Sequence, residues 1–474
     1  VASGVWSLDS QFEAQSSSIW PLAFPQTTIA NSCRFDAGSS DSLTRTPSGA
    51  GNRKTFTISV WFKISKITDD DGLIFAHSSS GSNDEDGLGY RSDGEIFFMA
   101  NNGSDAKLVS NAKHEDFSAW YNWVVAVDTT QGTASNRVKI YKNGIQVTSF
   151  STENYPSQDY QFKLNNNVHH SIGENDDGGG TGNFFSGYMA EVVMIDGQAL
   201  DQTSFGATNP VTNIWEPIAY TGTYGTNGFR LDFADSSALG NDVSGNNNDF
   251  TVNNLTSIDQ STDTCSNNFC TLNPLVPTSS AAFSEGNLKL VGSSSSAFNN
   301  RSQGTFGVQS GKWYFEVEFD SISATSPTIG IGRSDRSASD NPTGSNAGDV
   351  CIRADNEKYD EGSSSASYFS GSISAGNIIG VALDMDNGKV WFSKDGTFVG
   401  TVGSSGQAAT FTVGNGITIT PTLRPTDGTL ICNFGNSSVA ISSGNADANG
   451  FGNFEYAVPS GFFALCTKNL AEFG

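Results

Sequence analysis

The chain has 474 residues, more than one hydrophobic core usually holds, and suits two or three domains. Its formal net charge is −24, so it lacks a basic surface that could neutralise phosphate, and we expect no nucleic-acid partner. No apolar run approaches the ~20 residues of a membrane-spanning helix, so we expect no membrane insertion.

Turn-forming residues dominate the segments between the apolar runs. The chain contains 52 glycines, and serine, threonine and asparagine crowd the same segments. No long segment shows the periodicity of an amphipathic helix, whereas many short segments alternate between apolar and polar residues. The sequence therefore predicts an all-β protein of two antiparallel β-sandwich (jelly-roll) domains in tandem.

Residues 1–30 are predicted to form an N-terminal connecting or assembly segment. Its large apolar side chains could dock on a neighbouring surface: Trp6, Leu8, Phe12, Ile19 and Trp20. Two interpretations stay open, an arm that attaches the chain to a larger particle and a strap packed on its own domain. The chain begins with Val1 and not with Met, so we expect a start that is trimmed or processed. No secretion signal is visible.

Residues 31–215 are predicted to form the first sandwich. In KTFTISVWFKISK, one face of a strand is formed by Phe56, Ile58, Val60, Phe62 and Ile64, and the other by Thr55, Thr57, Ser59, Trp61 and Lys63. This alternation is typical of a sheet with one face in the core. Each buried apolar side chain contributes roughly 1.5–3 kcal/mol before entropy is subtracted.

A three-strand unit occurs twice in the chain. Residues 123–147 read WVVAVDTTQGTASNRVKIYKNGIQV, and residues 378–399 read IIGVALDMDNGKVWFSKDGTFV. In both copies the second strand is followed by Asn-Gly or Asp-Gly, the strongest local signal of an antiparallel hairpin. Two copies so far apart predict two domains of related all-β architecture.

Residues 216–280 predict a bridging segment, in which Leu231 and Phe233 could complete a sheet. The bridge is too apolar at these positions to be a free linker, so we expect domains that do not swing freely. Residues 281–474 predict the second sandwich, which includes the strand GKWYFEVEFD and the second copy of the three-strand unit.

Each sandwich carries a family resemblance. The motifs SVWFKI, WYNWVVAVD, KIYKNGIQV and GYMAEVVMIDGQALD together resemble the laminin-G-like, concanavalin A-like fold of lectins and glucanases over about residues 31–215. The order of GKWYFEVEFD, the repeated unit, ITPTLRP, NFG and the closing Pro-Ser-Gly-Phe resembles a SPRY domain over about residues 281–466. The resemblance implies two related sandwiches, the second from a family that acts mainly in protein recognition.

The segments SSDSLTRTP and YMAEVVMIDGQAL also resemble modules of bacteriophage virion proteins, especially tail or head fibres. This resemblance implies a place on the virion surface, contacts with other virion proteins, and attachment to a host-surface glycan or protein. Fibres are commonly trimeric, so a homo-trimer is a further expectation, although no heptad repeat specifies one.

One strand carries carboxylates at the spacing of a glycanase site. Glu316, Glu318 and Asp320 stand at i, i+2 and i+4, and so on one face of a strand. Glycanases of the concanavalin-like fold carry Glu-x-Asp-x-Glu, whose outer carboxylates act as nucleophile and acid/base. The order here differs and falls in the SPRY-like half, so we expect a solvated strand face and no enzymatic activity.

A sugar site in such a sandwich needs an aromatic platform and polar partners for hydroxyl groups. The residues expected near strand ends of the first sandwich are Tyr90, Arg91, Asn101, Asn102 and Trp120. The alternative for Trp120 is a place in the core.

Acidic turns make calcium the one cofactor to consider, because Asp/Asn/Gly loops supply the oxygen ligands of hard cations. Of these turns, Asp176 and Asp177 are the favoured ligands; the alternative is that turns select Asp for conformation alone. The neighbours His169 and His170 lack a third metal ligand. Six dispersed cysteines form no CxxC pair, so we expect no zinc site and small buried thiols, although Cys265 and Cys270 are close enough for a local disulfide.

Three functional hypotheses follow. The first is a non-catalytic bacteriophage adhesin that displays two recognition sandwiches toward a host-surface glycan or protein. The second is a protein that decorates the capsid without a receptor. The third is a secreted glycan-degrading enzyme, which rests on analogy of fold and the acidic strand.

Overall fold

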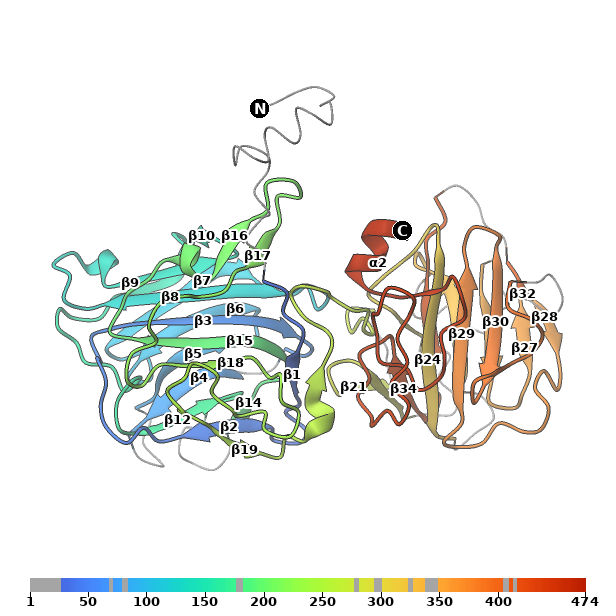
Figure 1. Cartoon of the computed structure of the whole chain (residues 1–474), viewed down its shortest axis with the longest axis horizontal. Helices are drawn as coiled ribbons and strands as arrows, with labels where there is room; N and C mark the ends of the chain where they lie inside the picture. Colours follow the sequence, from blue (N-terminus) through green and yellow to red (C-terminus); the bar gives the residue numbers. More distant parts are fainter. Residues whose placement is uncertain are drawn as a thin grey trace, which may run out of the picture.

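The computed structural model describes residues 27–67, 71–78, 84–175, 182–276, 281–293, 301–322, 327–336, 348–403, 409–411 and 416–474. Two β-sandwiches lie side by side, the first in blue to green and the second in yellow to red (Figure 1). The predicted all-β class of two tandem sandwiches is confirmed. No helix in the described parts is long and apolar enough to cross a membrane.

The first sandwich packs two eight-stranded sheets face to face. The first sheet has the order β10-β9-β8-β3-β15-β1-β20, with β18 paired to β15, and consists of β1 (Ser32–Phe35), β3 (Thr55–Ile64), β8 (Tyr121–Asp128), β9 (Val138–Lys142), β10 (Ile145–Gln146), β15 (Gly187–Asp196), β18 (Phe229–Leu231) and β20 (Gln260–Ser261). The second has the order β11-β7-β6-β5-β4-β12-β2-β19 and consists of β2 (Ser42–Arg45), β4 (Asp71–His77), β5 (Asp86–Tyr90), β6 (Glu95–Ala100), β7 (Ala106–Lys113), β11 (Phe150–Asn154), β12 (His169–Ile172) and β19 (Thr251–Asn253).

Two short hairpins and three 3-10 turns lie in the connections between these strands. They are the hairpins β13 (Glu174–Asn175) with β14 (Asn183–Phe184) and β16 (Gly206–Thr208) with β17 (Trp215–Pro217), and the 3-10 turns η1 (Ala134–Asn136), η2 (Gln202–Ser204) and η3 (Ser257–Asp259).

The alternation predicted for β3 is confirmed, but its second face is not solvated. Phe56, Ile58, Val60, Phe62 and Ile64 place their side chains in the main core. On the opposite face Thr57, Trp61 and Lys63 are also buried. Residues 198–220 and the bridging segment cover this face, for example through the hydrogen bond from Thr57 Oγ1 to Gln198 O (2.8 Å).

The second sandwich has a nine-stranded and a six-stranded sheet. The nine-stranded sheet consists of β21 (Ala281–Ser284), β22 (Lys289–Gly292), β24 (Lys312–Ser321), β29 (Ile378–Asp384), β30 (Lys389–Lys394), β31 (Thr397–Phe398), β32 (Ala409–Thr410), β34 (Thr429–Asn433) and β35 (Phe463–Ala464). The six-stranded sheet has the order β23-β33-β25-β26-β27-β28 and consists of β23 (Ser302–Gln303), β25 (Thr328–Arg333), β26 (Val350–Arg353), β27 (Lys358–Asp360), β28 (Ser363–Ser365) and β33 (Ile419–Arg424). The helix α2 (Thr467–Phe473) follows the last strand.

The repeated three-strand unit is present in both sandwiches. It forms β8-β9-β10 in the first and β29-β30-β31 in the second, with antiparallel pairing throughout. The tight turns after β9 and β30 contain two residues of positive φ, Asn143 (46°) with Gly144 (81°) and Asp395 (48°) with Gly396 (75°). This left-handed pair is what a two-residue hairpin turn requires, and it explains the Asn-Gly and Asp-Gly sequences.

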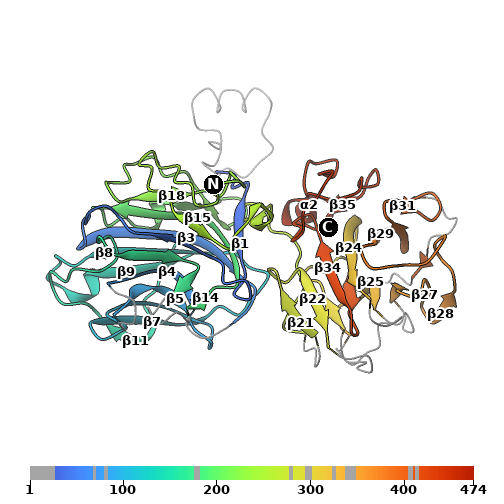
Figure 2. The same cartoon turned by 90° about the horizontal axis from the view of Figure 1, so that it is seen from below.

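The expected bridging segment contributes strands of the first sandwich. β18 pairs with β15, as Leu231 had suggested, and β19 and β20 pair with β2 and β1. The chain then enters the second sandwich, where Cys270 N donates to Leu465 O (2.9 Å). The connection between the two units is therefore short (Figure 2).

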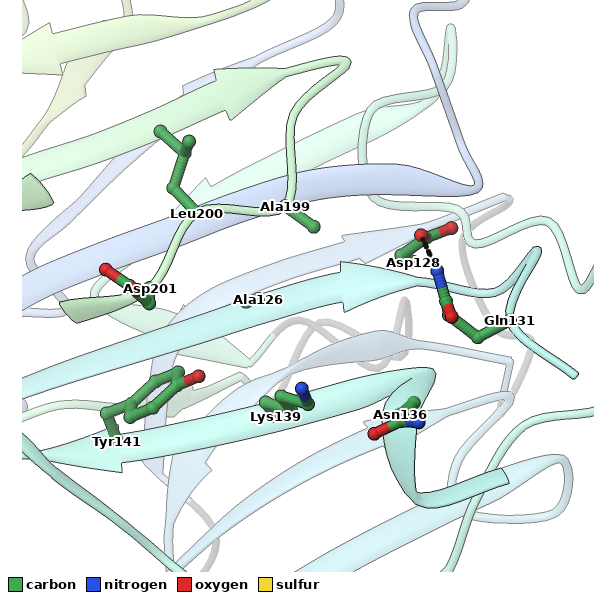
Figure 3. Close-up of a pocket in the computed structure, with 9 residues that line it drawn as sticks. All are labelled: Ala126, Asp128, Gln131, Asn136, Lys139, Tyr141, Ala199, Leu200 and Asp201. Carbon is green, nitrogen blue, oxygen red and sulfur yellow. Dashed lines mark hydrogen bonds between the residues drawn. The ribbon is translucent and has the colours of Figure 1, made fainter. Parts of the chain in front are cut away.

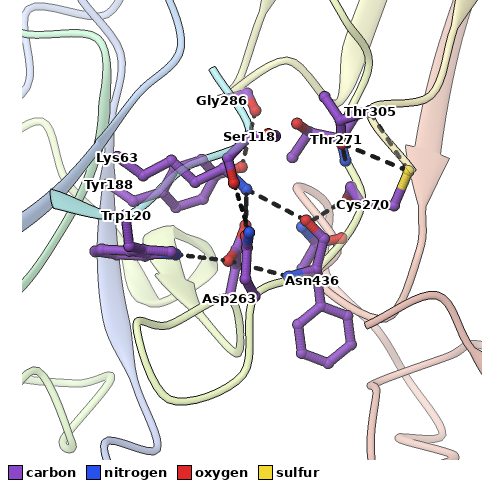
Figure 4. A network of polar contacts seen from close by, with 12 residues as sticks. Lys63, Ser118, Trp120, Tyr188, Asp263, Cys270, Thr271, Gly286, Thr305 and Asn436 are labelled. Carbon is purple, nitrogen blue, oxygen red and sulfur yellow. Dashed lines mark hydrogen bonds and ion pairs between the residues drawn. The ribbon is translucent and has the colours of Figure 1, made fainter. Parts of the chain in front are cut away.

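A buried polar network joins the two sandwiches at this connection (Figure 4). Lys63 Nζ on β3 pairs with Asp263 Oδ2 at 2.8 Å, and these side chains are 1% and 0% exposed. Nearby, Arg34 on β1 pairs with Asp259 (2.9 Å) and donates to Ser437 O of the second sandwich (3.4 Å). We infer that the junction is fixed, because a movement of one sandwich against the other would separate these buried charges from their partners at a high cost in free energy.

Candidate binding site

An open groove of about 350 Å³ lies at the junction of the two sandwiches. Its lining includes three tryptophans from separate segments, Trp61 on β3, Trp120 just before β8 and Trp215 on β17. The second sandwich contributes α2 residues, among them Lys468. The volume is in the range of about 300–1,000 Å³ that small-molecule sites occupy.

The tryptophan rings are held rigidly by groups beside the groove. Trp120 Nε1 donates to Asp263 Oδ1 (3.0 Å), the carboxylate that also binds Lys63. Trp215 Nε1 donates to Asn122 Oδ1 (3.0 Å). Because both indole N–H groups have protein partners, the half-buried rings offer apolar surface to a ligand and lose little freedom when one binds.

Glycine makes room for the Trp215 ring. A Cβ atom on Gly144, in the turn after β9, would lie 2.4 Å from the ring. The same turn therefore serves two purposes, since its positive φ of 81° closes the hairpin and its missing side chain admits the tryptophan.

Polar groups stand beside the rings. Glu216 Oε1 accepts from Asn209 Nδ2 (3.1 Å), while Glu216 Oε2 has no hydrogen-bond partner among the described residues. Asn268 Oδ1 accepts from Lys63 Nζ (2.8 Å). Lys468 Nζ lies 5.5 Å from the ring centroid of Phe451. Aromatic faces with a few polar groups form the arrangement that sugar rings need.

Only one of the five residues expected to bind glycan lies in this groove. Trp120 is half-buried there, outside the main core. Tyr90 is fully buried in the core, and its hydroxyl donates to His114 O, so its ring is closed to a ligand. Arg91 pairs with Glu95 (3.3 Å) at one end of β6.

The remaining two expected residues, Asn101 and Asn102, form the turn at the other end of β6, about 20 Å from Arg91 by strand geometry. The expected cluster of five therefore does not form. The sequence did not predict Trp61 and Trp215 as site residues. The one available signal concerned Trp61, a large aromatic side chain among the Thr, Ser and Lys residues of the second face of β3.

The acidic turns have internal roles where they are described. Asp176 and Asp177 lie outside the described residues. Asp86 is fully buried, accepts from Asn101 N (2.8 Å), and burial raises its pKa to about 6. Asp242 accepts from Arg230 N and Asn248 N (2.9 and 2.8 Å). Within the described ranges, no three His, Cys, Asp or Glu residues are grouped to hold a metal ion.

The histidines and cysteines also have structural settings. The rings of His77 and His169 lie 4.8 Å apart across β4 and β12, and His170 Nε2 accepts from Asn165 N (3.0 Å). All six cysteines are free thiols; Cys265 is partly exposed in the groove and the other five are buried.

The acidic strand is only partly solvated. Glu316 on β24 is 2% exposed and accepts from the amides of Glu455 and Tyr456, both at 2.9 Å, so it fixes the chain segment that closes the second sandwich. Burial raises its pKa. Glu318 is half-buried. Asp320 is exposed, and its Oδ2 lies 4.0 Å from Lys289 Nζ. The expectation of a solvated face is wrong for Glu316, because loop amides replace water there.

Two family models match the chain. Residues 37–204 match a laminin-G model described as the Concanavalin A-like lectin/glucanases superfamily, and residues 312–420 match the SPRY domain. No curated protein sequence matches the chain.

Several solved structures match parts of the chain at low identity. The SPRY domain of human HERC1 is 16% identical, with 34% of this chain and 96% of that chain covered and a TM-score of 0.27. A heptameric SAP-like pentraxin from Limulus polyphemus is 15% identical, with 44% and 94% covered and a TM-score of 0.31. A putative carbohydrate binding protein from Bacteroides ovatus is 14% identical, with 48% and 61% covered and a TM-score of 0.31. The chain thus carries a concanavalin A-like sandwich followed by a SPRY sandwich.

Proposed function

We propose that the chain is a non-catalytic recognition protein of a bacteriophage virion, and that its junction groove binds a glycan of the host surface. The observation that carries the proposal is the meeting of Trp61, Trp120 and Trp215 in one open groove beside Glu216. The virion assignment is supported by the likeness of SSDSLTRTP and YMAEVVMIDGQAL to bacteriophage virion modules. Other virion proteins would be its assembly partners.

The composition of the groove supports binding over hydrolysis. Glycosidases in general use two carboxyl groups that flank the scissile bond. Among the described residues, Glu216 is the one carboxylate in the groove lining, and the nearby Asp263 is fully buried and paired with Lys63. The acidic residues of β24 are elsewhere, in the second sandwich.

Display in several copies would suit such a site. Weak binding of single sugar units becomes strong attachment when many copies act on one surface. A trimeric arrangement on the virion surface would supply this effect, and calcium held by Asp176 and Asp177 is a further part of the proposal.

The test is binding of the purified chain to host cells and to a panel of host-surface polysaccharides, with and without EDTA. Trp120→Ala should weaken binding about tenfold or more, because aromatic contacts contribute about 0.5–1.5 kcal/mol beyond burial of area. Tyr359→Ala, at the distant strand β27, is the control. Binding lost with EDTA supports the calcium site, and equal binding by Trp120→Ala and the parent chain contradicts the groove.

A second candidate function, decoration of the particle without a receptor, is favoured by one observation. Ile145 on β10 is 74% exposed, and Val211 and Ile214, between β16 and β17, are 85% and 59% exposed. Exposed large apolar side chains are typical of protein contact surfaces. Absence of glycan and cell binding by the folded parent chain would favour this function.

A further inference from the structure

A second hollow, of about 360 Å³, lies on the face of β8 and β9 that points away from the main core (Figure 3). Ala126 and Tyr141 form its floor. Asp128 and the turn η1 border one end, and Asp201 lies on the other side, in the segment before η2. The lining is mostly polar and contains acidic, basic and amide side chains.

Some of these groups are already fixed by the protein. Asp128 accepts hydrogen bonds from Thr130 N (3.1 Å) and Gln131 Nε2 (2.5 Å). Asp201 accepts from Thr203 N (3.0 Å) and caps η2. The two carboxylates are therefore positioned acceptors with lone pairs to spare.

Three other groups have no side-chain partner among the described residues: the amide of Asn136, the ammonium of Lys139 and the hydroxyl of Tyr141. They lie in a row along η1 and β9 (Figure 3). Burial, followed by the nearby Asp201, raises the pKa of Tyr141, so its hydroxyl keeps its proton and can donate. The hollow thus presents free donors on one side and fixed acceptors on the other.

The charges select the ligand. Two carboxylates and one ammonium would repel an anion, and the chain as a whole carries −24. A cation alone lacks ligands, since no metal-binding group occurs among the described residues. A neutral molecule with many hydroxyl groups fits, because each hydroxyl can donate to a carboxylate and accept from an amide or ammonium group.

We propose that this hollow is a second saccharide-binding subsite, which takes a neutral sugar unit. The inference rests on the proposed function, and it names the ligand as a neutral polysaccharide long enough to contact both sites. Asn122, which holds Trp215 at the groove, and Asp128 at the hollow lie on one face at opposite ends of β8, about 20 Å apart. One glycan chain that fills both sites would bind more tightly than either unit alone.

The experiment is calorimetric titration of the full chain with neutral di- to octasaccharides from host-surface polysaccharide. Asn136→Ala with Lys139→Met should lower the affinity for the longest oligosaccharides about tenfold and leave disaccharide binding to the groove unchanged. Asn111→Ala with Lys113→Met, on β7 of the other sheet, is the matched control. Circular dichroism establishes that each variant is folded.

The outcomes separate the two sites. Unchanged affinity of Asn136→Ala with Lys139→Met at every oligosaccharide length overturns the subsite. If Trp120→Ala keeps full affinity while the hollow variant loses it, the groove fails and the subsite stands. Signals of ¹³C-methylated lysines give a direct readout: the Lys139 signal, assigned by its loss in Lys139→Met, should shift on addition of octasaccharide, and a stationary signal contradicts the proposal.

Discussion

The two copies of the three-strand unit have the same backbone pairing, but the outer face of the first is open and polar and that of the second is covered and apolar. Aligned on their Asn-Gly and Asp-Gly turns, Lys139 of β9 corresponds to Trp391 of β30. Lys139 lines an open polar hollow, whereas Trp391 is fully buried, with its ring 6.1 Å from that of Phe462. The C-terminal segment of the second sandwich covers its copy and creates a small additional core.

The difference shows that the repeated backbone determines pairing and turns, while the segment that lies over it determines which part of the outer face stays open. The covering segment of the first sandwich, residues 198–220, packs on part of the sheet and leaves the hollow and the tryptophan groove open at its two sides. The same kind of turn glycine admits Trp215 in one copy and Tyr456 in the other.

Exchanging the corresponding residues should affect the stability of the two copies most differently. Trp391→Lys removes a buried ring and places an unpaired ammonium in an apolar site, which should lower the free energy of unfolding by at least about 3–5 kcal/mol. Lys139→Trp should change it by less than about 0.5 kcal/mol, because the site is open. Urea unfolding measures both, and similar losses for the two exchanges would contradict the assignment of one covered and one open copy.

The junction pair should come next in size. Lys63→Met leaves Asp263 buried without its cation, which should cost about 3–5 kcal/mol and weaken the position of Trp120. Lys54→Met, which removes the exposed pair with Asp159, should cost about 0–1 kcal/mol. Equal, small losses in urea unfolding would show that the junction pair does not hold the sandwiches together.

The turn glycines allow a finer test. Gly144→Ala should cost about 1–2 kcal/mol for positive φ and a further ~1–3 kcal/mol for the clash with Trp215. Gly197→Ala has a similar φ of 87° and open space around it, so it isolates the backbone cost. Thermal unfolding compares the two, and the packing of Trp215 on Gly144 is refuted if both variants lose the same stability.

Acid should affect the first sandwich, which contains all four histidines. Burial lowers the pKa of His114 to about 3 and that of His170 to about 4. As the pH falls below about 6.5, these histidines become protonated in the unfolded chain but stay neutral in the native state. Each of the two therefore lowers the free energy of unfolding by about 1.4 kcal/mol per pH unit until its native pKa is reached.

Buried carboxylates oppose this loss. Burial raises the pKa of Asp41 to about 7 and that of Asp86 to about 6, so the native state gains their protons first and is stabilised as the pH falls. The contribution of His114 is isolated by His114→Gln: relative to the parent chain, its unfolding free energy should improve by about 1.4 kcal/mol per pH unit between pH 6.5 and 4. A difference that stays constant over this range contradicts the expected titration.

Local sequence signals predicted the local structure well. Alternation in β3 and the Asn-Gly and Asp-Gly pairs depend on neighbours in the chain, and both predictions are confirmed. The site depends on contacts between distant segments, which periodicity does not report. Trp61 and Trp215 meet because residues 198–220 fold over β3, and Tyr90 turns inward because the register of β5 places it beside the core.

Cys265 can report directly on ligand binding in the groove. It lines the groove beside the tryptophans and is the partly exposed cysteine, whereas the other five thiols are buried. Burial raises the pKa of Cys265, so its alkylation is followed at alkaline pH. If the groove binds glycan, saturating host-surface oligosaccharide should slow the alkylation severalfold, and Trp120→Ala should remove this protection. Alkylation at the same rate with and without bound oligosaccharide would contradict a glycan site in the groove.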